Sequence, residues 1–273
     1  VVTGILLLHP SLGGAISRWS FDLSTLALPH HHPDEAVIVY LDDESHKALG
    51  QPPNAPWDRS LHAGMIKQLT DEGAKLIVFD ILFDAPGPNP QADAVFQQAI
   101  AQAKNVVLVG ERVEIEQMDQ GTVEFVNRPL EEFSQFTKGW GLSNLEMDPD
   151  YAIRTHPISY DSFLPLSYAV NAAGSYPDDG IDHTNTALGD RWMRYYGPPG
   201  TIPFVSYHQA LFADGTPKDF FRDKVVFIGA LQSTGFSGSG KDMFLNPFPF
   251  TRGRFSSGVE VHATSFLNVM NRD

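Results

Sequence analysis

Two short apolar runs separated by one amphipathic segment constrain the fold of this chain most strongly. Residues 36–41, which are rich in β-branched side chains, precede Asp42, and residues 75–80 end in Asp80; their continuous apolarity is typical of strands buried on both faces. Between them, residues 58–73 contain a capping aspartate, apolar residues at helical spacing and a terminal glycine. The sequence therefore predicts a parallel βαβ unit with a right-handed crossover.

The rest of the chain extends this unit into a larger sheet. A helix is predicted to begin at Asn89-Pro90, and residues 112–125 alternate around a turn, which predicts an antiparallel hairpin. We therefore predict an α/β fold, a three-layer sandwich with a mostly parallel central sheet and antiparallel hairpin additions in the middle of the chain. The further expected elements are strands at 106–109, 192–196 and 224–229 and helices at 164–173, 207–212 and 259–270.

The first 33 residues differ in character from the rest. Residues 1–8 are mostly apolar, but His9-Pro10 stops the run far short of the ~20 residues that a membrane span needs. We expect this run to be the trailing end of a membrane helix, followed by an extended linker at 29–33. The predicted organisation is a membrane-proximal segment at 1–33 and a single α/β domain at 34–273.

Charge and composition exclude several classes of function. The 273 residues carry 19 Lys and Arg against 33 Asp and Glu, a net charge of −14, with no cationic stripe that would attract a phosphate backbone. Nucleic acid is therefore not an expected partner. The absence of cysteine excludes disulfides, thiolate metal sites and cysteine nucleophiles.

Three short motifs suggest a chemical function, but none of them is complete. Residues 235–241 match a phosphate-binding loop until Asp242 replaces the required Ser or Thr, and no G-x-S-x-G elbow follows any predicted strand. Asp148 and Asp150 open a calcium-loop pattern, but Ala152 and Ile153 occupy the positions of the next ligand and the turn glycine. The triple histidine at 30–32 lies in an extended segment and does not converge on one ion.

A cluster of charged residues is expected at the carboxyl edge of the sheet, where ligands bind in open α/β folds. Asp42 and Asp80 end two neighbouring strands, and Arg59 and His62 begin the helix between them. A structural alternative is that Arg59 neutralises Asp42 or Asp80 and that His62 is a core residue. The candidate ligand-binding residues are Asp42, Arg59, His62, Asp80, Asp242, Glu260 and His262.

The same residues carry a resemblance to a known family. The segments 39–45, 56–63, 73–83 and 258–263 resemble the type-2 CHASE domain, and further matched blocks extend the resemblance over residues 37–269. Asp58 stands where the family usually has proline, and Tyr151-Ala152 replaces a common glycine. The resemblance implies an extracytoplasmic, non-enzymatic sensory domain of a bacterial membrane receptor with a cytoplasmic cyclase or kinase output.

Two other functions stay open from the residues alone. A metal-dependent hydrolase would place a divalent cation on Asp42, Asp80 and Glu260, with His62 as acid and base. A structural self-assembly module would need no ligand. If the chain is a sensory domain, its expected partners are a small ligand or cation, a second copy of the chain in a homodimer, and a membrane contacted through flanking helices. No cofactor is expected apart from a divalent cation.

Overall fold

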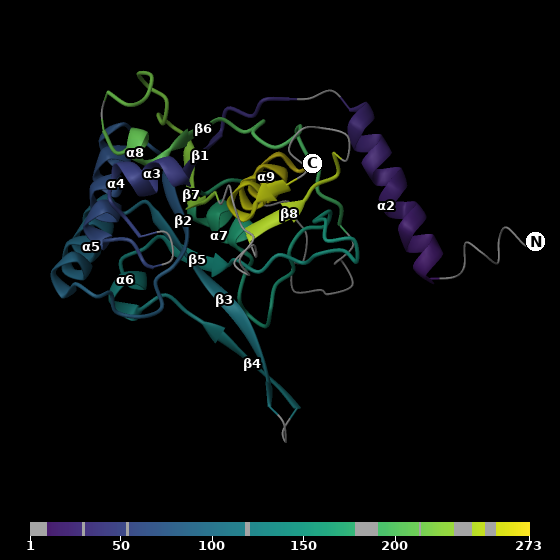
Figure 1. Cartoon of the computed structure of the whole chain (residues 1–273), viewed down its shortest axis with the longest axis horizontal. Coiled ribbons are helices and arrows are strands. Elements are labelled where there is room, and N and C mark those ends of the chain that lie inside the picture. Colours follow the sequence, from purple (N-terminus) through teal and green to yellow (C-terminus); the bar gives the residue numbers. More distant parts are fainter. Residues whose placement is uncertain are drawn as a thin grey trace, which may run out of the picture.

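The architecture was determined as a computed structural model, which describes residues 10–28, 31–52, 55–117, 121–177, 191–212, 214–231, 242–248 and 255–273. Figure 1 shows the sheet at the centre of the molecule and the first helix at its periphery. The helices are α2 (Pro10–Ala27), α3 (Asp43–Ala48), α4 (Arg59–Asp71), α5 (Pro90–Ala103), α6 (Glu131–Ser134), α7 (Leu166–Ala173), α8 (Tyr207–Ala210) and α9 (Gly258–Asn271). The strands are β1 (Ala36–Leu41), β2 (Leu76–Leu82), β3 (Val106–Gln117), β4 (Gly121–Asn127), β5 (Gly139–Leu142), β6 (Phe204–Ser206), β7 (Val225–Ala230), β8 (Met243–Leu245) and β9 (Phe255–Ser257).

The main sheet has seven strands in the order β4-β3-β2-β7-β1-β6, with β5 also paired to β3. All of its pairings are parallel except β3 with β4. The first half of β3 runs beside β2, and its second half continues with β4 as a two-stranded ribbon that projects from the body (Figure 1). The predicted α/β class with an antiparallel hairpin addition is confirmed.

Local sequence explains the βαβ unit at the centre. The Asp58 side chain accepts a hydrogen bond from the Ser60 amide and caps α4, as predicted. Gly73 follows the helix with φ of +83°, a left-handed conformation that favours glycine. The chain then enters β2, whose first four residues are fully buried.

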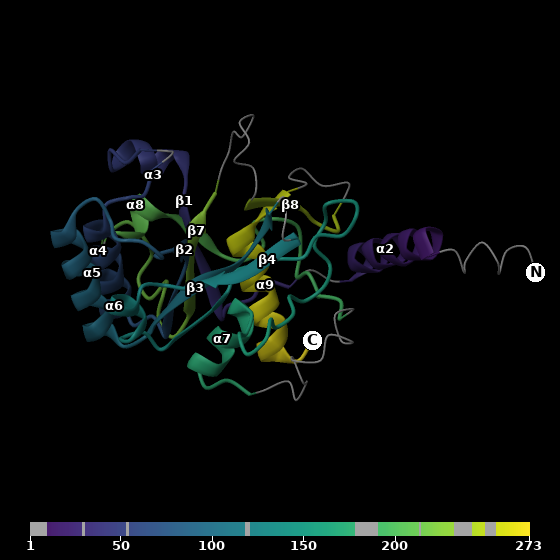
Figure 2. The ribbon, with the colours of Figure 1, turned by 90° about the horizontal axis from the view of Figure 1, so that it is seen from below.

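Helices cover both faces of the sheet. One core joins α4, α5 and α8 to residues such as Val39, Phe79 and Ile228, and a second core joins α7 and α9 to residues such as Ile38, Val78 and Phe227. Figure 2 shows α4 and α5 on one side of the strands and α7 and α9 on the other. The predicted three-layer sandwich is therefore confirmed, and neighbouring residues along each strand face opposite layers.

Helix α9 lies very close to the sheet at Gly229. A Cβ atom at this position would come within 2.6 Å of the Val259 side chain, so the strand needs a glycine there. This contact fixes the first turn of α9 beside the carboxyl end of β7.

Two predicted elements differ from the structure. Residues 192–196 do not form a strand, because only an isolated bridge joins Trp192 to Thr155, and the helix at 207–212 is shorter, ending at Ala210. No helix was predicted over Pro10–Ala27, where the structure has α2, and the apolar run at 1–8 lies outside the described residues. Within the described parts of the chain, no helix is both long and apolar enough to cross a membrane.

Candidate functional site

The predicted charged cluster is divided between the two faces of the sheet. Asp80 alternates with Phe79 along β2 and lies on the side of α9, whereas Phe79 packs in the core beneath α4. Arg59 and His62 belong to α4 and lie on that opposite side. The structure therefore separates Arg59 and His62 from Asp80.

Arg59 pairs with an aspartate that the sequence argument did not consider. Its Nη1 lies 2.8 Å from Oδ1 of Asp93, and its Nη2 donates to the Ala85 carbonyl oxygen at 2.6 Å. The guanidinium also lies over the rings of Phe83 and Phe133, at 5.4 and 5.1 Å from their centroids. The alternative pairing of Arg59 with Asp42 or Asp80 is thus wrong, because Arg59 forms its ion pair with Asp93 on the neighbouring helix α5.

Replacing Arg59 by alanine should lower the free energy of unfolding by about 2–3 kcal/mol. This is less than the loss typical of a broken buried pair, because a cavity of about 200 Å³ lined by Arg59 and Asp93 lets water reach the remaining carboxylate. Urea denaturation gives the value. Asp93→Asn in the Arg59→Ala background should restore part of it, and a melting temperature unchanged in Arg59→Ala would contradict the buried pair.

His62 is a core residue rather than a ligand-facing one. Its Nδ1 lies 2.9 Å from the Tyr207 hydroxyl, and its ring stacks on Trp57 with 6.3 Å between centroids. Burial, together with the nearby Arg59 charge, lowers its pKa to about 3. It is therefore a neutral packing residue near pH 7, as the structural alternative expected.

Asp42 and Glu260 each accept hydrogen bonds from groups outside the strand-end cavity. Asp42 caps α3 by accepting from the Ser45 amide at 2.8 Å, and it also accepts from the Ser206 hydroxyl. Although burial pushes the pKa of Asp42 upward, these hydrogen bonds outweigh it and leave the pKa below its usual value. Glu260 accepts from the Gly200 amide at 2.6 Å, and burial raises its pKa to about 6.

The metal site expected on Asp42, Asp80 and Glu260 is not assembled. Among the residues that the structure describes, no three His, Asp or Glu side chains are grouped to hold a metal ion. On α9, Glu260 lies two positions from both Gly258 and His262, so it points away from the face that they share. The hydrolase that depended on this triad loses its structural basis.

A cavity of about 850 Å³ lies at the carboxyl edge of β2, and three of the candidate ligand-binding residues line it. Asp80, Asp242 and His262 line it together with Glu111, which follows the buried part of β3. Glu111 was not among the predicted site residues, although Glu111 follows a buried apolar run just as Asp80 does. The other described lining residues are Ser143, Asn144, Leu145, Met147, Tyr151, Met243, Phe244, Leu245, Phe255 and Gly258.

Asp80 and His262, two groups that line this strand-end cavity, have shifted pKa values. Burial, and then the charge of Asp242, raises the pKa of Asp80 to about 7, and the Asp80 side chain is 16% exposed. Burial lowers the pKa of His262 to about 4, so its ring is neutral near pH 7. The 4.0 Å between His262 Nε2 and Asp80 Oδ1 is therefore not a charged pair at that pH.

His262 presents an unused acceptor. Its Nε2 lies 3.1 Å from the Ser143 carbonyl oxygen, which can only accept, so Nε2 carries the hydrogen and Nδ1 holds a lone pair. That Nδ1 is buried without a hydrogen-bond partner among the described residues. A buried polar atom without a partner costs free energy, which makes such an atom informative at a candidate site.

The loop that forms one wall of the cavity is also attached to α2. Leu145, Met147 and Tyr151 line the cavity, while Asp148 and Asp150 of the same loop bind Arg154 at 2.8 Å each. The other side of the Arg154 guanidinium binds Asp22 of α2 through two bonds of 2.7 and 2.8 Å. One arginine thus joins the cavity wall to the first helix.

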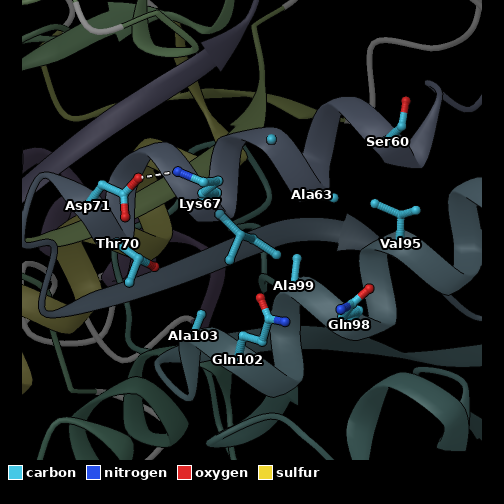
Figure 3. A pocket seen from close by; sticks show the side chains of 12 residues that line it. Ser60, Ala63, Lys67, Thr70, Asp71, Val95, Gln98, Ala99, Gln102 and Ala103 are labelled. Carbon is cyan, nitrogen blue, oxygen red and sulfur yellow. Dashed lines mark hydrogen bonds and ion pairs between the residues drawn. The ribbon is translucent and has the colours of Figure 1, made fainter.

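A second hollow, of about 560 Å³, lies between α4 and α5. Figure 3 shows that small side chains such as Ala63, Ala99 and Ala103 face it, with the ion pair of Lys67 and Asp71 at one end. None of the candidate residues lines this groove. The strand-end cavity is therefore the better candidate for a ligand site.

Fold and cavity together define an α/β domain with a ligand-sized cavity at the carboxyl ends of its parallel strands. A family model described as the CHASE2 domain matches residues 1–273, the whole chain, and the chain belongs to this family. CHASE2 domains are extracytoplasmic sensory domains of signalling receptors and are not catalytic, which fits a non-enzymatic role for this chain. The comparisons with curated proteins and with solved structures gave no match.

Proposed function

We propose that this sensory domain binds a small organic cation, an amine or ammonium compound, in the strand-end cavity. The observation that carries the proposal is the composition of the cavity wall. Its described acidic residues are Asp80, Glu111 and Asp242, its described histidine, His262, is neutral near pH 7, and no described Lys or Arg lines it. A ligand that donates hydrogen bonds and carries positive charge suits this set of acceptors.

The apolar part of the wall favours an organic cation over a bare metal ion. Phe244, Phe255 and Tyr151 supply aromatic rings, and Met147 and Met243 supply thioethers, at the same cavity. Aromatic rings attract ammonium groups through their negative faces and bury the attached carbon atoms. A bare divalent ion would instead need several oxygen ligands in close contact, and the described residues offer no such group.

Two elements connect the cavity to other parts of the domain and could transmit a conformational change caused by ligand binding. Helix α9 begins at the cavity with Gly258 and His262 and runs to Asn271, beside Asp273. The loop at 143–152 reaches α2 through Arg154. In a membrane receptor, both routes would lead toward flanking membrane helices and a cytoplasmic cyclase or kinase.

Isothermal titration with spermidine, choline and arginine, each with Mg²⁺, Ca²⁺ and Zn²⁺ as comparison, tests this proposal. At least one of the organic cations should bind, and Asp80→Asn should weaken it at least about tenfold, the effect of losing ~1.4 kcal/mol. The matched control Asp71→Asn removes an exposed carboxylate on α4 and should leave binding unchanged.

Other outcomes would count against the proposal. Binding of a divalent metal that depends on Asp80, without any organic cation, would favour a metal sensor. Failure of every organic cation to bind would remove the ligand class proposed here.

A further inference from the structure

Helix α2 uses only one of its faces to contact the rest of the domain. On that face, Phe21 packs against Trp192 with 4.6 Å between ring centroids, and Asp22 binds Arg154. Thr25 is buried, and Leu26 packs against the small core that contains Ile153. These contacts fix the orientation of the helix on the body.

A neighbouring face of α2 exposes three large apolar side chains. Ile16, Trp19 and Leu23 are 47%, 70% and 57% exposed. Their spacing of three and then four residues is that of alternating a and d positions in a coiled coil. Scattered exposed apolar residues are ordinary, but an apolar stripe at this spacing fits the matching stripe of another helix.

The charges of α2 also indicate what covers this stripe. Its exposed residues besides the stripe are alanines and serines at 15, 17, 20, 24 and 27, and the described charged residues Arg18 and Asp22 are only partly exposed. A helix that lies on a membrane surface typically surrounds its apolar face with several Lys and Arg, whereas α2 has one arginine, Arg18, and no lysine. Two copies of a chain with net charge −14 repel each other least through an uncharged face.

We propose that the Ile16–Trp19–Leu23 face of α2 binds the same face of a second copy of this chain. The contact is isologous, so each stripe packs against its own counterpart across a two-fold axis. The small alanine and serine side chains beside the stripe allow the two helices to approach closely. This interface does not depend on the ligand proposed for the strand-end cavity.

The absence of cysteine makes a cross-linking test unambiguous. Trp19→Cys places one thiol at the centre of the stripe, where the two copies approach for either relative direction of the helices. Mild oxidation should convert most of this variant to a disulfide-linked dimer at micromolar concentration. The matched control Lys67→Cys places a thiol at an exposed position of α4, far from the stripe in sequence, and should form little disulfide-linked dimer. Equal cross-linking of the two variants would overturn the proposal.

Sedimentation equilibrium supplies a second test that needs no thiol. The unmodified chain should show a monomer–dimer equilibrium, and Leu23→Asp should weaken it at least tenfold while circular dichroism stays unchanged, because Leu23 is exposed. A chain that stays monomeric at every accessible concentration would overturn the proposal. So would flotation of the unmodified chain with phosphatidylglycerol vesicles that Leu23→Asp abolishes, since the stripe would then bind lipid.

Discussion

Replacing Arg154 by alanine is expected to lower the free energy of unfolding by about 3–5 kcal/mol, the usual effect of breaking a buried ion pair. The arginine is 3% exposed and donates to Asp22, Asp148 and Asp150 through Nε, Nη1 and Nη2. Burial alone would lower its pKa, but these hydrogen bonds raise the pKa above its ordinary value. Without the guanidinium, the three carboxylates would repel each other. Urea denaturation followed by circular dichroism measures the loss.

Two variants separate the buried network from an ordinary surface charge. Arg222→Ala removes an exposed arginine that pairs with the exposed Asp219, and it should change stability little. Arg154→Lys keeps the charge but cannot form the two-bond contacts, so it should be intermediate. Equal losses for Arg154→Ala and Arg222→Ala would show that the network contributes nothing beyond a surface pair.

The apolar runs were sufficient to predict the central strands of the sheet, because strands buried on both faces leave a strong local signal. Residues 36–41 form β1 with the predicted bounds, and the alternating residues at 112–125 form the β3–β4 hairpin. β5 escaped prediction because Gly139-Trp140-Gly141-Leu142 is short and has no alternation. The bridge at Trp192 depends on Thr155 and not on local sequence.

The candidate site could be predicted only in part. Residues that share the carboxyl edge of the sheet can still lie on opposite faces of it, where they do not meet. Placing Asp80 at the carboxyl end of β2 was enough to locate the cavity. Assigning Arg59 to the same site was wrong. Phe79 and Asp80 are consecutive in β2 and so face opposite sides of the sheet, and Arg59 lies on the side of Phe79. The partner of Arg59 is 34 positions away, at the start of α5, and only the packing of α4 on α5 brings them together.

Asp80→Asn is expected to become progressively more stable than the unmodified domain as the pH rises from 4 to 7. The pKa of Asp80 is about 7 in the folded domain, above its ordinary value of 3.8, so the folded state binds this proton more tightly. The stability that Asp80 contributes is present below pH 3.8 and is lost as the pH rises through 7. Three pKa units correspond to about 4 kcal/mol between these limits. Urea denaturation of both proteins at several pH values measures the difference.

Neighbouring groups alter the pH profile of the unmodified domain, so the difference between the two proteins is the informative quantity. Asp242, Glu111 and His262 line the same cavity. The lowered pKa of His262, about 4, makes its contribution increase with pH up to 6.5, opposite in sign to that of Asp80. Asp42→Asn is the matched control: the pKa of Asp42 is lowered, so this variant should lose relative stability as the pH rises. A difference curve for Asp80→Asn that stays flat would contradict a buried, protonated carboxyl.

The same proton links stability to the proposed ligand. A cation that binds the ionised Asp80 must displace the proton, so its affinity should rise as the pH increases through 7, while Asp80→Asn should bind weakly at every pH. Titrations at pH 6 and pH 8 test this dependence. An affinity independent of pH in the unmodified domain would mean that the ligand does not contact the Asp80 carboxyl, even if it occupies the strand-end cavity.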